Sequence, residues 1–373
     1  MSLINMLRNK NTNHSFWQMI HVDLPLLLGI LILIGIGLSI LYSSSNQNLY
    51  VIEQQGLRIG LGLVMMMIFA QIPPIVYQRW AVWIYSIGII FLIAVLFVGH
   101  VGKGAERWLN LGFMRFQPSE LMKLAIPLFL AAQLHKIHLP LTSQSILFSF
   151  TIILIPVLLT VKQPDLGTAI LLLLAGGSIL FLAGLSVRLI LLCIGFATVL
   201  APAIWYMMHD YQRQRVLIFL NPEYQPLGAG YHIIQSKIAI GSGGLFGKGW
   251  LNGTQSHLHF LPEHSTDFIF AVCGEEFGFI GNLFIITLFM IIILRGLYIT
   301  VNAQDTFTRL LAGGLTLTFF FSFFINMGMV TGILPVVGLP LPLISYGGSS
   351  IVTLMASFGM LMSIQTHRKL LTT

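Results

Sequence analysis

The chain has 373 residues, of which 56% are hydrophobic and only 8% are charged. Soluble domains carry about 25% charged residues, so this composition excludes an ordinary soluble protein and indicates an integral membrane protein. The formal net charge is +7, but the basic residues stand singly at the ends of apolar runs. That distribution is typical of loops that flank membrane helices and does not indicate nucleic-acid binding.

Apolar segments of near-spanning length follow one another along the whole chain. Each is close to the about 20 residues that cross the hydrocarbon of a bilayer. No small-x-small cleavage pattern follows the first segment, so we interpret it as an uncleaved span and not a signal peptide. The sequence predicts an all-α polytopic membrane protein, a bundle of about ten transmembrane helices in one domain over residues 1–373 with one large extracytoplasmic loop. The expected spans are residues 24–42, 56–72, 81–99, 120–135, 145–161, 167–184, 188–208, 268–294, 308–330 and 343–364.

Three prolines and two cysteines lie inside these apolar runs. Pro127, Pro156 and Pro202 are compatible with membrane helices, because neighbouring groups can hydrogen-bond the carbonyls that a proline leaves free. Cys193 and Cys273 are expected to be small buried hydrophobic residues and not a disulfide.

The distribution of basic residues predicts the orientation. With the N-terminus inside, the inner face carries nine basic residues and two acidic ones, Asp23 and Asp305, as the positive-inside rule expects. Residues 1–22 then form a cytoplasmic N-terminal segment, residues 209–267 form a large periplasmic loop, and both termini are cytoplasmic. The inner basic residues are Arg8, Lys10, Arg79, Lys136, Arg188, Arg295, Arg309, Arg368 and Lys369.

Ten basic residues (19 − 9) remain on the outer face, against that rule. An anionic substrate held at the outer membrane surface would explain them, and pairing of single residues with outer acids is the alternative. They are Arg58, Lys103, Arg107, Arg115, Lys123, Lys162, Arg213, Arg215, Lys237 and Lys248.

The first outer segment ends in Pro118-Ser119-Glu120, which is typical of a helix start. Glu120 and Lys123 are three residues apart and therefore share one face of the fourth span. They form either an ion pair that only stabilises the helix or part of a functional site, which we favour because ionisable groups at membrane depth are costly. Trp108 either belongs to the interfacial aromatic belt or stacks on a sugar or lipid head group.

The second outer segment, residues 162–168, is short and contains Asp165. This residue either caps the sixth helix or supplies a third charge to the pair of Glu120 and Lys123. The residues alone leave both interpretations open.

The large outer loop has three parts before its last turn. Residues 210–215 form a polar exit from the seventh span and include Arg213 and Arg215. Residues 228–240, with Lys237, have apolar positions at helical spacing and predict an amphipathic helix on the membrane surface. The glycine-rich residues 241–249 could bring backbone amides to phosphate oxygens, although they lack the context of a P-loop.

A group of histidines and acids ends this loop: His257, His259, Glu263, His264 and Asp267. The spacing argues against a zinc site, because there is no H-E-x-x-H pattern with two ligands one helical turn apart. A divalent cation, Mg²⁺ or Mn²⁺, shared with a substrate phosphate is the interpretation that we retain. No organic cofactor is expected.

Asp267 directly precedes an apolar helix and is the candidate catalytic base. Ser265-Thr266-Asp267 is also a good N-cap sequence, and a cap alone would contribute about 1 kcal/mol. Partial desolvation at the lip of a membrane helix would make the carboxylate a better base. Further along the helix, Glu275 and Glu276 are expected to face the bundle interior.

The last outer segment, residues 326–350, is dense in glycine and proline. At membrane depth this composition predicts a re-entrant segment or broken helix that faces a cavity. A plain hairpin between two spans is the alternative.

Several of these motifs together resemble the SEDS family (shape, elongation, division and sporulation). The resemblance extends from about Asp23 to Lys369, and its motifs are long and specific. They are Gly104-Ala105-Glu106-Arg107-Trp108, Phe116-Gln117-Pro118-Ser119-Glu120, Gln163-Pro164-Asp165-Leu166-Gly167-Thr168, residues 236–249, Phe260-Leu261-Pro262-Glu263, Thr266-Asp267-Phe268 and Pro342-Leu343-Ile344-Ser345-Tyr346-Gly347-Gly348-Ser349.

This resemblance implies a ten-span peptidoglycan glycosyltransferase that polymerises lipid II at the outer face of the bacterial inner membrane during cell elongation and the maintenance of rod shape. It also implies a class B penicillin-binding protein as partner, together with the nascent glycan strand and membrane lipids. Asp267 then falls on the catalytic carboxylate. Cavity and substrate-binding positions are expected at Arg107, Trp108, Glu120, Lys123, Asp165, Arg213, Arg215 and Lys237.

The expected chemistry needs only one carboxylate. Asp267 would take the proton of the attacking sugar hydroxyl, and the departing lipid pyrophosphate needs positive charge and not a general acid. A lipid II flippase is the competing function, but it needs charges on both sides of the midplane, whereas the acids here cluster toward the outer half. A non-catalytic scaffold for the penicillin-binding protein is the third possibility.

Overall fold

The computed structural model describes residues 20–368 except 99, 103–104, 111–114, 138–141, 209, 222–228 and 259. Most of the described chain is helical, and three short strands pair antiparallel in the order β1-β2-β3. The elements are α2 (Leu24–Ser44), α3 (Leu49–Gln71), α4 (Pro74–Val98), β1 (His100–Gly102), β2 (Ala105–Asn110), β3 (Arg115–Phe116), α5 (Pro118–Leu134), α6 (Ser143–Lys162), α7 (Leu166–Leu182), α8 (Val187–Met207), α9 (Asp210–Leu220), α10 (Ala229–Ser242), α11 (Thr254–His257), α12 (Ile269–Val301), α13 (Thr306–Val330) and α14 (Ser349–Thr366).

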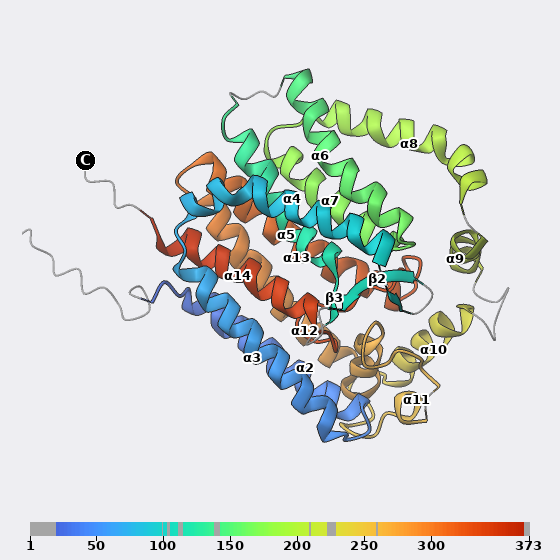
Figure 1. The fold of residues 1–373 in the computed structure, drawn as a ribbon. Helices are drawn as coiled ribbons and strands as arrows, with labels where there is room; N and C mark the ends of the chain where they lie inside the picture. The colour runs from blue at the N-terminus through green and yellow to red at the C-terminus, as the bar shows by residue number, and fades with distance from the viewer. Residues whose placement is uncertain are drawn as a thin grey trace, which may run out of the picture.

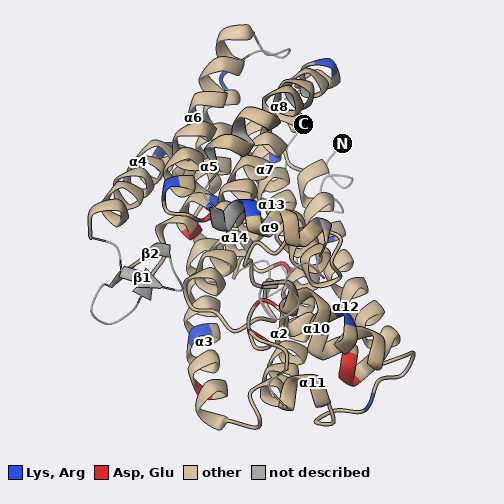
Figure 2. Cartoon of the chain, turned by 90° about the vertical axis from the view of Figure 1, so that its right-hand side faces the viewer, with Lys and Arg blue, Asp and Glu red and all other residues tan. Residues whose placement is uncertain are grey.

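Every segment expected to span the membrane overlaps one of these helices. Within the described residues, seven helices are long and apolar enough to cross a membrane, and the chain is a multi-pass membrane protein. Figure 2 shows how few charged residues the long helices carry. The start of α3 was predicted seven residues too late, because polar residues in its first turns interrupt the apolar run while Asn48 caps it by accepting a bond from Tyr50 N at 3.1 Å.

The two described ends of the chain meet on one side of the bundle (Figure 1). The rings of His21 and His367 stack with centroids 3.8 Å apart. Nearby, Arg295 donates to both oxygens of Asp23, at 3.0 and 2.6 Å. Asp23 and Arg295 therefore lie at the same face, as the charge distribution predicted. The strands, α10 and α11 gather on the opposite side of the bundle.

Pro156 shows how the bundle accommodates a proline inside a span. A proline has no N–H, so the carbonyl four residues earlier, that of Ile152, loses its helical donor. The hydroxyl of Tyr85 on α4 donates to that carbonyl at 2.8 Å. A neighbouring helix thus hydrogen-bonds the carbonyl that the proline leaves free, as the sequence predicted.

The helix α12 is interrupted at Gly278, whose φ of 68° and ψ of −162° are accessible essentially only to glycine. The break frees backbone groups on both sides, and the glycine-rich segment 241–249 pairs with them. The amides of Lys248 and Gly249 donate to the carbonyls of Glu275 and Glu276, at 3.0 and 2.9 Å. The idea that these two amides bind phosphate is therefore wrong for the observed fold.

At two of its glycines this segment approaches α12 too closely for a side chain. A Cβ at Gly247 would lie 2.1 Å from the Glu276 carbonyl oxygen, and one at Gly243 would lie 1.9 Å from that of Gly274. Gly243 and Gly247 therefore serve close backbone packing. On the far side of the break, the amides of Phe279 and Ile280 donate to the carbonyls of Gly244 and Leu245.

Candidate active site

Asp267 lies in the turn of residues 262–268 that enters α12, and it is partly exposed. Phe268 holds the N-cap position and makes no side-chain capping bond. Asp267 therefore precedes the cap, which disfavours the interpretation that it serves only as a helix cap. A Cβ built on Gly338 would lie 3.5 Å from Asp267 Oδ2, so the carboxylate faces the last outer segment.

The main chain around Asp267 is held from two directions. Asn326 Nδ2, on α13, donates to the Asp267 carbonyl at 2.9 Å. Ser345 Oγ donates to the carbonyl of Thr266 at 2.6 Å, and the Tyr346 amide donates to the carbonyl of Ser265 at 2.9 Å. The residues before Asp267 therefore pair with the last outer segment.

That last segment has no helix between the end of α13 and the start of α14, in agreement with the prediction of a broken membrane segment. Gln55 of α3 holds it with both ends of its amide. Gln55 Nε2 donates to the carbonyl of Ser345 at 3.2 Å, and Gln55 Oε1 accepts from the Gly347 amide at 3.3 Å. One turn further along α3, the guanidinium of Arg58 lies 4.4 Å above the ring of Tyr346.

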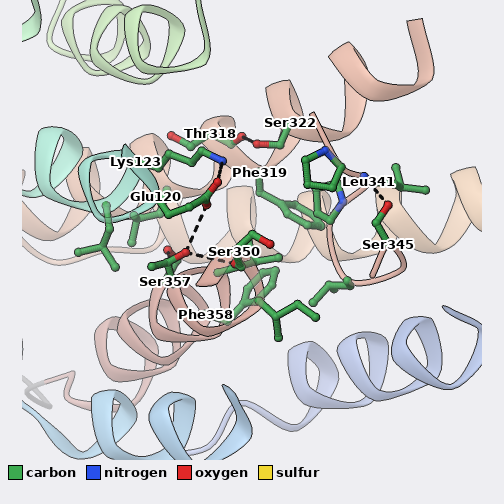
Figure 3. Close-up of a pocket in the computed structure, with 18 of the residues that line it drawn as sticks. Glu120, Lys123, Thr318, Phe319, Ser322, Leu341, Ser345, Ser350, Ser357 and Phe358 are labelled. Carbon is green, nitrogen blue, oxygen red and sulfur yellow. Dashed lines mark hydrogen bonds and ion pairs between the residues drawn. The ribbon is translucent and has the colours of Figure 1, made fainter. Parts of the chain in front are cut away.

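Glu120 and Lys123 form an ion pair on α5, at 2.7 Å. The exposed fractions of their side chains are 6% and 16%, so the pair is largely buried. Thr353 Oγ1 also lies 3.5 Å from Glu120 Oε2. Figure 3 shows the two side chains pointing toward one another in a pocket between α5, α13 and α14. The polar residues that line it are Glu120, Lys123, Thr318, Ser322, Ser345, Ser350, Thr353 and Ser357.

Residues 340–343 and Ser345 form one wall of this pocket. Ser345 also contacts the segment that carries Asp267 through its bond to Thr266. The pocket and Asp267 are therefore connected by the same irregular segment, a connection between distant parts of the chain that the sequence did not reveal.

Asp165 caps α7, as one of the two interpretations predicted. Its Oδ1 accepts from the Thr168 amide at 3.2 Å. Its Oδ2 accepts from Thr168 Oγ1 at 2.9 Å and from Gln117 Nε2 at 3.2 Å. Because Gln117 immediately precedes α5, the capping carboxylate also ties the start of α7 to the helix that carries Glu120.

The remaining predicted substrate residues have different surroundings. Arg213 lies on α9, and its Nε and Nη2 donate to the carbonyls of Trp205 and Tyr206 at 2.8 and 2.7 Å, which caps the end of α8. Trp108 lies on β2 and is half-buried. The side chains of Arg107 on β2 and Arg215 on α9 lie outside the described residues.

Lys237 occupies an exposed position on α10, close to Gly332. The helix α10 packs against α12 and α13, and Ser236 Oγ donates to the Val330 carbonyl at 2.7 Å. A helix is therefore present at the expected residues, and its buried face packs on α12 and α13 of the bundle.

Glu275 and Glu276 are buried, and their partners come from the outer loop and from the end of α2. Glu275 Oε1 accepts from Lys248 Nζ at 2.7 Å and from the Thr254 amide at 2.8 Å. Glu276 accepts a bond from Ser43 Oγ. The pair thus fixes the outer loop to α12 and to the end of α2.

No three His, Cys, Asp or Glu side chains of the described residues converge closely enough to hold a metal ion. His259 lies outside the described part of the chain. The described side chains therefore do not form a cluster of three such metal ligands.

Sequence reasoning missed three polar residues near Asp267: Gln55, Arg58 and Asn326. Arg58 was noted only as an outer basic residue. Gln55 and Asn326 are buried, and their one sequence signal is an amide side chain at the edge of an apolar run. An amide there is costly unless it is hydrogen-bonded, but the sequence does not say to what.

Comparison with known proteins connects this geometry to a family. A family profile described as "Cell cycle protein" and covering FtsW, RodA and SpoVE matches residues 16–370. The peptidoglycan glycosyltransferase MrdB of Escherichia coli K12 is 52% identical over 364 residues, which cover 97% of this chain and 98% of that protein.

Two solved structures are also similar. One is a chain from work on the structural coordination of polymerization and crosslinking by a peptidoglycan synthase complex, with a TM-score of 0.81 and 32% identity over 92% of this chain and 97% of that chain. The other is the rod shape determining protein RodA of Thermus thermophilus, with a TM-score of 0.71 and 26% identity over 93% of this chain and 98% of that one. This chain belongs to the FtsW/RodA/SpoVE family of cell cycle proteins, the SEDS family.

Proposed function

We infer that this protein is a peptidoglycan glycosyltransferase that polymerises lipid II into glycan strands for cell elongation and rod shape, with Asp267 as the general base. The observation that carries the assignment is the placement of the Asp267 carboxylate beside Gly338, ahead of the helix cap. The activity in the name of MrdB, a relative aligned over almost the full chain, supports the same reaction class here.

In the proposed reaction, Asp267 accepts the proton of a sugar hydroxyl on the acceptor. The hydroxyl oxygen bonds to the anomeric carbon of the donor, and the bond from that carbon to the lipid pyrophosphate breaks. The pyrophosphate leaves with the electron pair and is stabilised by nearby positive charge. Lys123, which lines the pocket, is one candidate for that charge. Arg107 on β2 and Arg213 and Arg215 on α9 are the others.

The setting of this reaction is the periplasmic face of the bacterial inner membrane, with both termini in the cytoplasm. The excess of basic residues on the assigned inner face supports that orientation. A class B penicillin-binding protein is the proposed partner that crosslinks the product. The similarity to a chain of a peptidoglycan synthase complex supports such a partner.

Asp267→Asn in the purified protein tests the base. The amide keeps the shape of the side chain but cannot accept the proton, so polymerisation of lipid II should fall by about 10²- to 10⁴-fold. Asp305→Asn is the matched control, because Asp305 caps α13 far from the site and asparagine caps a helix about as well as aspartate, so both stability and turnover should be retained. Near-normal glycan synthesis by Asp267→Asn would refute the base assignment.

The same assay separates the enzyme from the flippase and the scaffold. Fluorescent lipid II is supplied to the wild-type protein in vesicles, with and without the penicillin-binding protein. Long glycan chains support the glycosyltransferase. Lipid that changes leaflet without being joined supports a flippase, and partner binding without either activity supports a scaffold.

A further inference from the structure

The side chain of Asn326 bonds directly to the backbone of Asp267 from another helix. It lies on α13, four residues before that helix ends, and is fully buried. Its Nδ2 donates to the carbonyls of Asp267 at 2.9 Å and Leu339 at 2.6 Å. One amide group thus joins the turn that carries the proposed base to the irregular segment that follows α13.

The chemistry of an asparagine side chain explains the arrangement. The NH₂ group has two hydrogens in a fixed fork, so it can serve two carbonyls at once. Both neighbours are carbonyl oxygens, which assigns the nitrogen to their side. Both carbonyls also belong to non-helical backbone, which in a membrane protein needs donors from elsewhere in the fold.

The geometry links this fork to the reacting carboxylate. Leu339 directly follows Gly338, and a Cβ built on Gly338 would lie 3.5 Å from Asp267 Oδ2. Asn326 therefore bonds to the backbone on both sides of the contact between the Asp267 carboxylate and Gly338. One bond goes to Asp267 itself, and the other goes to Leu339, the residue after Gly338. Because α13 is a long, largely buried helix, it holds the amide group of Asn326 in a fixed position.

We propose that Asn326 is a positioning residue that fixes Asp267 relative to Gly338, so that its carboxylate is aligned with the attacking hydroxyl. This proposal rests on the assignment of Asp267 as the base. Asn326 does not touch the reacting atoms in it; its role is to prevent Asp267 from moving away. A displacement of about 1 Å in a catalytic group can reduce a rate by about 10²-fold.

Asn326→Leu tests the proposal, because leucine has a similar volume and no donor. The purified protein is assayed on lipid II together with its penicillin-binding partner. The proposal predicts a kcat lower by about 10²-fold with KM for lipid II changed by less than about threefold, since alignment and not binding is lost. Thr316→Val is the matched control: Thr316 is a buried polar residue of the same helix, and its hydroxyl donates to the carbonyl of Ala312 at 2.8 Å. The control should keep its kcat.

Asn326→Ser is the second variant, in case the leucine protein does not fold. Serine keeps one donor, so kcat should fall by about tenfold while thermal unfolding stays cooperative. An unchanged kcat in a folded variant would overturn the proposal, and so would a KM that rises as much as kcat falls.

The double variant with Asp267→Asn separates this proposal from the proposed function. If Asn326 acts through Asp267, Asn326→Leu should cause no further loss from the residual rate of Asp267→Asn. A full additional loss would overturn the positioning role and leave the base assignment intact. Normal activity of Asp267→Asn alone would instead refute the base, whatever Asn326→Leu does.

Discussion

At the scale of single residues, the site is built from polar side chains that hold backbone. Asn326, Gln55 and Ser345 each bond to main-chain groups of the segments around Asp267. Buried amides and hydroxyls are costly without partners, so each of these residues specifies one arrangement of the chain near it. The charged residues are held in the same way, in pairs: Glu120 with Lys123 and Glu275 with Lys248.

Removing one partner of the Glu120–Lys123 pair should be more damaging than removing both. Lys123→Met leaves a largely buried carboxylate without its cation, and such a loss costs about 3 kcal/mol or more. The double variant Glu120→Gln, Lys123→Met leaves no buried charge and should recover most of that stability. Thermal unfolding of the purified variants measures the difference, and equal destabilisation in the single and double variants would show that the pair is not coupled.

The burial of His232 on α10 should make stability depend on pH. Burial lowers the pKa of His232 below 6.5, and the charge of Glu263 opposes this shift more weakly. The unfolded chain therefore binds the proton first as pH falls below about 6.5, and stability is lost across the window down to the folded pKa. His232→Gln should show a smaller drop in melting temperature than the wild type between pH 7 and pH 5.5. If the melting temperatures of the two proteins fall in parallel with pH, His232 is not the source of the pH dependence.

At the scale of elements, breaks in helices are supported by other elements. Pro156 frees a carbonyl in α6 that Tyr85 of α4 bonds, and Gly278 breaks α12 where segment 241–249 pairs with it. The segment between α13 and α14 is held by α3 and by the turn before α12. Unpaired backbone is costly away from water, so each irregular stretch requires a particular neighbour.

Tyr85→Phe should therefore destabilise the protein by about 1–3 kcal/mol, because the Ile152 carbonyl loses its donor. The ring contact of Tyr85 with Phe129 remains possible for phenylalanine. Adding Pro156→Ala restores a backbone N–H four residues after Ile152 and should recover part of the loss. The stability of the wild type, of Tyr85→Phe and of the double variant is measured by unfolding in detergent. If Pro156→Ala gives no recovery in the Tyr85→Phe background, the carbonyl is not the cause.

At the scale of the whole molecule, the bundle brings together four segments that are distant in the chain. The segment before α14 lines the Glu120–Lys123 pocket together with α5, and it also bonds to α3 and to the turn at Asp267. Figure 1 shows α3 and α14 running side by side, and they are in extensive contact. The site therefore depends on the packing of the bundle and not on any one loop.

This arrangement leads to a prediction about metal ions. Because no metal-binding cluster exists among the described side chains, Mn²⁺ should bind appreciably only when a lipid-linked pyrophosphate supplies further oxygen ligands. Electron paramagnetic resonance of Mn²⁺ with the purified protein, with and without lipid II, measures this. Asp267→Asn should weaken the lipid-dependent binding if that carboxylate shares the ion. Tight binding to the protein alone would contradict the prediction.

The sequence by itself determined the features that depend on neighbours along the chain. Apolar runs of spanning length predicted the membrane helices, and a separation of three residues predicted the Glu120–Lys123 pair, because helix geometry fixes which side chains are adjacent. The motifs also indicated the family and selected Asp267 as the candidate base.

Only the tertiary structure decided what holds Asp267 in place. Asn326 and Asp267 are 59 positions apart, and Gln55 and Gly347 are 292 apart. Contacts over such separations depend on how the helices pack, and the local pattern of residues in the sequence does not predict that packing. For the same reason the sequence did not show how the glycine-rich segment packs: its composition suits phosphate binding and close backbone packing equally, and the break at Gly278 pairs two of its amides with α12.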